Sequence, residues 1–158
     1  MVLVLYKKLK IKIDYEIRQI DMEFEKIDSL LYKCQNSEPD YIELTAIGAV
    51  LHSFYTGIES MFIMIEKHQG NELSTDKYWH KTLLENATQK KGKREPIIST
   101  ELKGTLFEYL QFRHVFRHSY SFQIEWVKIK PLVNNLEKNW NMVKSEIRNF
   151  ITKGLSDE

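Results

Sequence analysis

The sequence has a single cysteine and no long hydrophobic run. Cys34 is the only cysteine among 158 residues, which excludes an internal disulfide framework and a cysteine-based zinc site and points to the cytoplasm. Because no run of about 18 apolar residues is present, we expect no membrane span. The N-terminal MVLVLY is too short for the apolar region of a signal peptide and follows no basic residues, so we expect no signal peptide.

The sequence also has almost no net charge. The formal charge is +1, so any nucleic-acid contact must come from a local patch rather than from the whole surface. Apolar residues make up 42% and charged residues 28%, which is ordinary for a globular protein. A chain of this length fits one domain, and we expect residues 1–158 to form a single helical domain.

No segment shows sustained strand alternation, an internal repeat or a low-complexity tract, whereas helical spacing is clear. In the first stretch apolar residues recur at steps of three and four, which predicts one long amphipathic helix that ends near Cys34, before the breaker at 36–39. The apolar positions of this helix are Val2, Tyr6, Leu9, Ile13, Ile17, Ile20, Phe24, Ile27 and Leu31.

Four more helices are predicted, joined by short connections. The second helix is expected to follow Asp40 and to end at 68–71. The third starts at Ser74 or Thr75 and ends at about Thr88. The fourth starts at 99–101, and the last starts at Pro131. Five helices with short connections predict an all-α fold, an antiparallel bundle with a long N-terminal helix.

The fourth helix carries a charge in its apolar stripe. On a wheel of about 100° per residue, Arg113 lies roughly 20° from Leu106. Because an isolated buried charge is costly, Arg113 has a carboxylate partner inside the bundle, or faces a cleft or interface, or snorkels with its head in water. His114, Arg117 and His118 lie on an adjoining polar arc. The stripe itself consists of Leu102, Leu106, Tyr109, Leu110 and Phe116.

The string FRHVFRHSY, residues 112–120, combines these polar residues in a known pattern. It reads Arg113, four residues, His118, one residue and Tyr120. This R-x4-H-x-Y pattern resembles that of the HepT-like toxins, which belong to the HEPN superfamily of helical bundles. Many HEPN enzymes carry Asn or Asp after the arginine, whereas this chain has His114.

The resemblance extends beyond the motif. LHSFYTGIESMF, residues 51–62, looks like the second helix of such proteins, and REPIISTEL, residues 94–102, precedes the motif as it does in relatives. The resemblance thus covers most of residues 40–150. It implies a toxin of a toxin–antitoxin system that cleaves RNA to a 2′,3′-cyclic phosphate without a cofactor. It also implies that a partner nucleotidyltransferase antitoxin modifies Tyr120 with AMP.

The residue types suit RNA cleavage without a metal. Such cleavage needs a base for the 2′-OH, an acid for the 5′-oxygen and positive charge at phosphorus. His118 is the candidate base or acid because histidine side chains exchange protons at physiological pH, and Arg113 offers a planar cation for phosphate oxygens. His114 is a candidate second proton-transfer group, and Arg117 a candidate phosphate contact.

On one ideal helix Arg113 and His118 point about 140° apart, so the motif does not converge by itself. Either the helix loosens at 118–121, or two copies of the motif meet across a dimer interface, as in HEPN ribonucleases. A homodimer would place Arg113 on an isologous apolar contact. The apolar residues of that expected contact are Leu102, Leu106, Tyr109 and Phe116.

Two further features have a functional and a plain interpretation. Glu59 and His52 are seven residues apart on one helix face, and Glu59 is a candidate partner that orients Arg113; otherwise it is a solvent-facing carboxylate. The loop 89–98 is basic, and either guides the RNA backbone or is a solvated turn. Its basic residues are Lys90, Lys91, Lys93 and Arg94.

Two other functions compete with the ribonuclease. His114 and His118 stand at i, i+4, the spacing of two metal ligands on a helix, but no HExxH motif or nearby acidic residue supplies a third ligand, so we expect no metal. A HEPN-type helical domain also serves as a non-catalytic binding or scaffold module. The intact arginine and histidine of the motif favour the enzyme.

Overall fold

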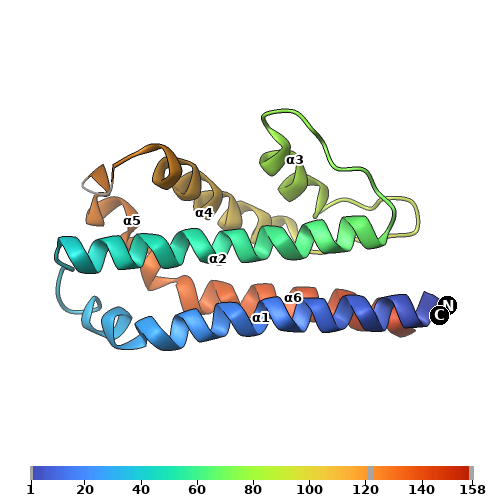
Figure 1. Ribbon diagram of the computed structural model, residues 1–158, viewed down its shortest axis with the longest axis horizontal. Helices are drawn as coiled ribbons and strands as arrows, with labels where there is room; N and C mark the ends of the chain where they lie inside the picture. Colours follow the sequence, from blue (N-terminus) through green and yellow to red (C-terminus); the bar gives the residue numbers. More distant parts are fainter. Residues whose placement is uncertain (1, 121–122, 157–158) are drawn as a thin grey trace.

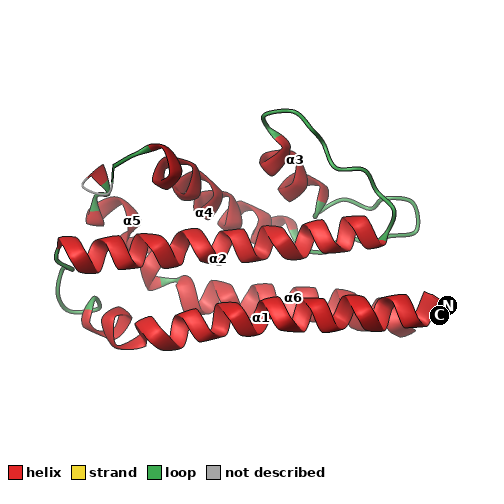
Figure 2. Cartoon of the chain, viewed as in Figure 1, coloured by secondary structure: helices red, strands yellow, loops and turns green. Residues whose placement is uncertain are grey.

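The computed structural model describes residues 2–120 and 123–156. Within these residues the chain forms six α-helices and no strand (Figure 2). The helices are α1 (Val2–Lys33), α2 (Tyr41–His68), α3 (Trp79–Asn86), α4 (Thr100–His118), α5 (Trp126–Asn134) and α6 (Leu136–Ser156). The predicted all-α bundle is confirmed, with six helices in place of five.

Helix α2 is the central element of the bundle. It runs antiparallel beside α1, and α6 lies along α1, so the two ends of the chain lie at one end of the molecule (Figure 1). On its other side α2 packs against α3, α4 and α5. Side chains of α2 can therefore reach α3 and α4 at the same time.

The starts of α2 and α4 follow the sequence signals. Asp40 accepts a hydrogen bond from the Glu43 N–H at 2.8 Å, and Glu43 accepts one from the Asp40 N–H at 3.0 Å, which forms a capping box. Ser99 caps α4 by accepting from the Leu102 N–H at 3.1 Å. The backbone N–H and hydroxyl of Ser99 donate to Glu146, at 2.7 and 2.8 Å, which fixes the start of α4 against α6.

The predicted boundaries of the third and last helices are wrong. Ser74 accepts from the Asp76 N–H at 3.4 Å, and Asp76 accepts from the Tyr78 N–H at 2.7 Å, so these residues form turns and α3 begins only at Trp79. Pro131 lies inside α5 rather than at the start of the last helix, which begins after a break at Asn135.

Among the described helices, α2 alone is long and apolar enough by composition to cross a membrane. Its most apolar window has a mean hydropathy of 1.2, and 56% of that window is buried inside the bundle. The central helix of a helical bundle has the same properties. The composition of α2 is therefore weak evidence for a membrane span.

Candidate functional site

Arg113 is buried and paired with a carboxylate of the same chain. Its Nη1 donates to Oε1 of Glu59 at 2.6 Å, and the two residues are 7% and 3% exposed. Glu59 lies on α2 where α2 packs against α4. Of the arrangements that the sequence left open for Arg113, the structure has the internal ion pair. This pairing satisfies the requirement that a buried charge has a partner.

His80 of α3 joins this ion pair. Its Nδ1 lies 2.7 Å from Oε2 of Glu59 and 3.3 Å from Nη1 of Arg113. Because a carboxylate only accepts, we assign the ring hydrogen to Nδ1 and the hydrogen bond to Glu59. Glu59 thus holds an arginine with one oxygen and a histidine with the other. No pattern in the sequence pointed to His80, which is 33 residues from Arg113 along the chain.

A groove of about 630 Å³ runs between the start of α3 and the second half of α4. Its wall contains four Lys or Arg side chains and three histidines, and none of the described residues that line it is acidic. The lining residues are Lys77, Tyr78, His80, Lys81, Leu110, Gln111, Arg113, His114, Val115, Arg117 and His118. The groove is therefore strongly positive although the chain as a whole is nearly neutral.

The groove brings Arg113 and His118 together within one chain. Helix α4 ends at His118, and Ser119 has extended backbone angles (φ −124°, ψ 155°). The histidine rings of His114 and His118 face each other across one turn, with 4.7 Å between their centroids. Within the described residues, no group of three or more His, Cys, Asp and Glu is placed to hold a metal ion.

Tyr120 lies just beyond the end of α4. Its side chain is 73% exposed, and its backbone N–H donates to Oε1 of Gln123 at 3.0 Å. Tyr120 does not line the groove, but it is two residues from His118, which lines it. Ser121, the last residue of the segment where we expected the helix to loosen, lies outside the described residues.

The charges of the groove act on a neighbouring histidine of α2. Burial, followed by the positive charges of Arg113 and Arg117, lowers the pKa of His52. The ring of His52 packs against Phe116, with 5.3 Å between the centroids. His52 shares the face of Glu59 on α2, as the spacing predicts, but does not line the groove.

The basic loop has a structural arrangement of its own. Arg94 is 4% exposed, lies 3.0 Å from Glu66, and donates to the backbone oxygens of Asn86 and Glu95 at 3.0 and 3.1 Å. Lys91 lies 3.7 Å from Glu66, Lys90 pairs with Glu95 at 2.8 Å, and Lys93 is exposed. None of these four basic residues lines the groove. They precede α4, whose 19 residues separate them from His118 by about 28 Å of helix.

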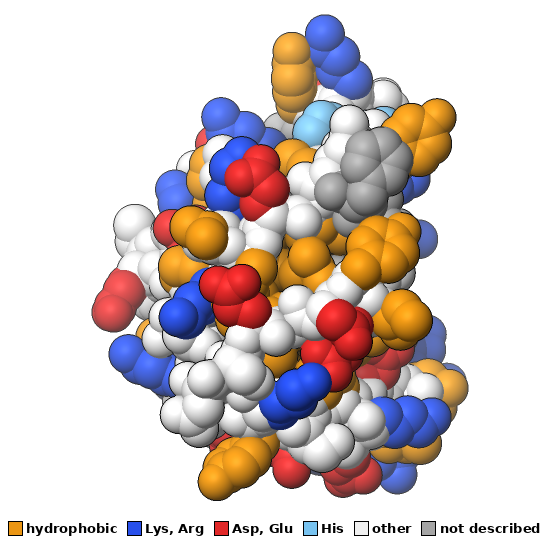
Figure 3. Space-filling view, turned by 90° about the vertical axis from the view of Figure 1, so that its left-hand side faces the viewer, with side chains coloured by type: hydrophobic (Ala, Val, Ile, Leu, Met, Phe, Trp, Pro, Cys, Tyr) orange, Lys and Arg blue, Asp and Glu red, His pale blue; other side chains and the backbone are white. Residues whose placement is uncertain are grey.

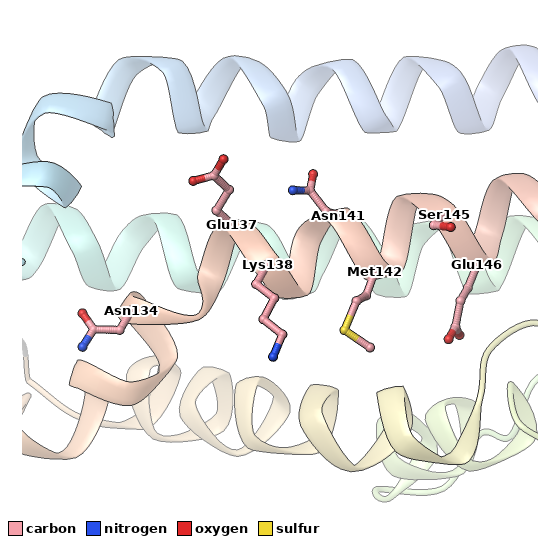
Figure 4. Close-up of a pocket in the computed structure, with 7 residues that line it drawn as sticks. All are labelled: Asn134, Glu137, Lys138, Asn141, Met142, Ser145 and Glu146. Carbon is pink, nitrogen blue, oxygen red and sulfur yellow. The ribbon is translucent and has the colours of Figure 1, made fainter.

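Another hollow near the surface differs in charge. It lies along α6 and measures about 720 Å³ (Figure 4). Its charged residues are Glu137, Lys138 and Glu146, and Glu146 already caps α4 through Ser99. A surface with two carboxylates, one ammonium group and no histidine offers no match for a phosphodiester. We therefore place the site at the positive groove.

The apolar face expected to form a dimer contact is packed inside the protomer, so that expectation is wrong. Leu102, Leu106 and Tyr109 are 0% exposed. The Tyr109 hydroxyl donates to the Leu132 backbone oxygen at 2.7 Å, and burial raises the pKa of Tyr109 to about 12. Exposed apolar side chains include Val115, within the motif on α4, and Val127 on α5.

The end of the molecule near α5 is not uniformly charged. Lys, Arg, Asp and Glu side chains alternate over it with apolar ones between them, and histidine comes to the surface only near its upper edge (Figure 3). The concentration of positive charge in the α3–α4 groove is thus a local property. This matches the local patch that the small net charge required.

Comparison with known proteins places the chain in a family. A model of a family described as HepT-like protein matches residues 46–154. No curated protein and no solved structure matches the chain. The matched segment is more than half of the chain and contains Glu59, the residues that line the groove and the R-x4-H-x-Y motif. The protein belongs to the HepT-like family.

Proposed function

We propose that this protein is the toxin of a toxin–antitoxin system and cleaves RNA without a metal. Membership of the HepT-like family supports a HEPN-type ribonuclease of the toxin kind. The observation that carries the proposal is the positive groove, in which Arg113, His114, Arg117 and His118 border one cavity. Phosphodiester cleavage by the neighbouring 2′-OH needs only proton transfer and positive charge, and the groove offers both.

Each motif residue has a distinct role in this reaction. Arg113, held at the floor of the groove by Glu59, supplies fixed positive charge near the phosphorus. Arg117 is exposed and contacts a phosphate of the substrate. His118 and His114, both exposed in the groove, transfer the protons that leave the 2′-OH and reach the 5′-oxygen.

The test is RNA cleavage by the purified protein in EDTA. We expect wild type to leave 2′,3′-cyclic phosphate ends, and His118→Ala and Arg113→Lys each to lower the rate about 10²-fold or more while the helical content is unchanged. His68→Gln, outside the groove, serves as the matched histidine control. Cleavage only with added metal would favour a site at His114 and His118, and no cleavage at all would favour a scaffold.

Regulation acts through Tyr120 in this proposal. An exposed phenol two residues beyond His118 is accessible to a nucleotidyltransferase, and the arginines of the groove attract the phosphates of its nucleotide. The attached AMP brings negative charge and volume to the mouth of the groove, so RNA is excluded without unfolding. Tyr120→Phe should keep its RNA cleavage and gain no AMP-sized mass when incubated with the partner transferase and ATP. Equal mass gain on wild type and mutant would rule out this assignment.

A homodimer brings two grooves together in this proposal. Val115 is exposed in the last turn of α4, within the motif, so a contact there would adjoin the groove rather than bury the core stripe. Light scattering should report about twice 18.9 kDa at micromolar concentration. A monomer that still cleaves RNA would show that one groove is enough.

A further inference from the structure

The groove has two walls, and the motif accounts for only one of them. Arg113, His114, Arg117 and His118 all come from α4. The opposite wall is the segment 77–81, at the start of α3, which contributes Lys77, Tyr78, His80 and Lys81. None of these four residues belongs to the R-x4-H-x-Y motif. Their chemistry nevertheless matches what a ribonuclease site needs.

His80 has the surroundings that are typical of a histidine that transfers protons, because a carboxylate binds one of its ring nitrogens. Its Nδ1 donates to the buried Glu59, which does not line the groove, whereas His80 itself does. Because Nδ1 is bound to Glu59, Nε2 is the ring nitrogen of His80 that stays available to a substrate in the groove. The Trp79 ring stacks on it, with 3.6 Å between centroids and 30° between planes. A carboxylate on Nδ1 fixes the tautomer that leaves Nε2 as an acceptor.

Tyr78 has the surroundings of a stacking platform for a base. It is 62% exposed, and the Lys77 Nζ lies 4.9 Å from its ring centroid. Lys81 follows one turn later on the same side of the groove. Proteins bind single-stranded nucleic acid with such a combination, because the ring stacks on any base and the ammonium groups contact the flanking phosphates.

We propose that segment 77–81 is the second half of the active site and binds an unpaired nucleotide of the RNA. Tyr78 stacks on its base, and Lys77 and Lys81 hold the phosphates beside the scissile one. His80, in place of His114, is the base for the 2′-OH, and His118 stays the acid. The inference rests on the proposed ribonuclease function and adds to it the residues that hold a single-stranded substrate.

The reaction balances with the groups present. Nε2 of His80 takes the proton of the 2′-OH, the O2′ forms a bond to phosphorus, and the bond from phosphorus to O5′ breaks. His118 gives its proton to O5′, which leaves as a 5′-hydroxyl, and the other product is the 2′,3′-cyclic phosphate. His80 ends protonated and His118 neutral, and proton exchange with water restores both. The charged groups that face His80 are Glu59 from α2, Arg113 from α4, and Lys77 and Lys81 from its own segment.

The role of His80 is tested by His80→Asn. The amide nitrogen of Asn takes the place of Nδ1 and keeps the hydrogen bond to Glu59, but it cannot accept a proton. We expect kcat to fall about 10²-fold or more with KM little changed, and the acidic limb of the pH profile of kcat/KM to disappear. A variant with kcat within about twofold of wild type, or with the acidic limb intact, would overturn the assignment.

The role of Tyr78 is tested by binding rather than cleavage. The probe is a short single-stranded RNA with 2′-O-methyl groups, which cannot be cleaved. Tyr78→Leu should weaken its binding about tenfold or more, Tyr78→Phe should keep it, and Tyr32→Leu, an exposed tyrosine of α1, is the matched control. An unchanged Kd for Tyr78→Leu, or equal affinity for duplex RNA, would overturn this part.

The two failures are distinguishable. If wild type binds the methylated RNA through Tyr78 but never cleaves unmodified RNA, the proposed function is contradicted, whereas the nucleotide subsite is supported. If wild type cleaves RNA, and His80→Asn and Tyr78→Leu both behave like wild type, the role of segment 77–81 is contradicted, whereas the ribonuclease function is supported. In the second case the α4 residues alone make the site.

Discussion

Helix α2 carries two buried glutamates, Glu59 and Glu66, seven residues apart and 3% and 2% exposed. Each pairs with a buried arginine from another part of the chain. Arg113 of α4 lies 2.6 Å from Glu59, and Arg94 of the basic loop lies 3.0 Å from Glu66. In both arginines Nε is buried without a hydrogen-bond partner. By charge and burial the two ion pairs are alike, although Oε1 of Glu66 also has no hydrogen-bond partner, whereas both oxygens of Glu59 have one.

The surroundings of the two ion pairs differ. The pair of Glu59 adjoins a groove of about 630 Å³ with three histidines. The hollow beside Glu66 holds about 10 Å³, and the hollow of about 770 Å³ that Arg94 lines contains one histidine, His68. The remaining hydrogen bonds of Arg94 go to backbone oxygens of Asn86 and Glu95, so it ties the loop to the end of α3. A buried ion pair is thus no sign of a functional site by itself. The difference lies in the lining of the adjoining hollow, which has three histidines and no acidic residue beside Arg113 but one histidine and two glutamates beside Arg94.

The largest effect that tests this comparison is on stability. Arg94→Met leaves Glu66 with Lys91, at 3.7 Å, as its cation and with the hydrogen bond from Asn71 Nδ2 at 2.6 Å, and breaking a buried pair costs about 3–5 kcal/mol in the free energy of unfolding. Urea unfolding should show this loss, and Arg94→Lys should recover part of it. The rate of RNA cleavage per folded molecule should stay at the wild-type level. A folded Arg94→Met protein that cleaves more than tenfold slower would make the Glu66 pair functional.

A smaller effect separates the two glutamates by activity. In Glu59→Gln the amide can present its NH2 group to His80, which reverses the ring tautomer and puts the hydrogen on Nε2. We expect cleavage to fall about tenfold or more with the fold retained. Glu66→Gln has the same change of charge and shape but no histidine to misorient, so its cleavage rate per folded molecule should match wild type. Equal rates for both variants would contradict the comparison.

The sequence predicts the fold well where one local signal decides the structure. The capping box at Asp40 and the cap at Ser99 give the starts of α2 and α4. Pro131 led to a wrong start for the last helix because proline favours the first turn of a helix. Here it lies inside α5, and packing decides the break at Asn135. Ser74 misled because its hydroxyl is equally suited to a turn.

The sequence predicts the site in part. The rule that a buried arginine needs a carboxylate led to Glu59, and periodicity alone revealed Arg113 as the exception in an apolar stripe. His80 stayed hidden because its contact with Glu59 spans 21 residues and depends on where α3 begins. Arg94 looked like part of an RNA-binding loop because a basic run does not reveal which of its members is buried.

The smallest expected effect is on the pKa of His52, which responds to the positive charge of the groove. His52 has its pKa lowered from the ordinary 6.5, first by burial and then by Arg113 and Arg117. A histidine whose pKa is lower in the folded state binds fewer protons than in the unfolded chain. Its contribution to stability is therefore full above pH 6.5 and is lost as pH falls through the folded pKa.

NMR titration of His52 should show the lowered value, and Arg117→Gln should raise it. His52→Gln should lose less stability than wild type between pH 7 and pH 5. Arg94→Lys, at the ion pair of Glu66, should leave the titration of His52 unchanged. A pKa of 6.5 or more in wild type, or one that Arg117→Gln does not move, would show that the positive charge of the groove does not reach α2.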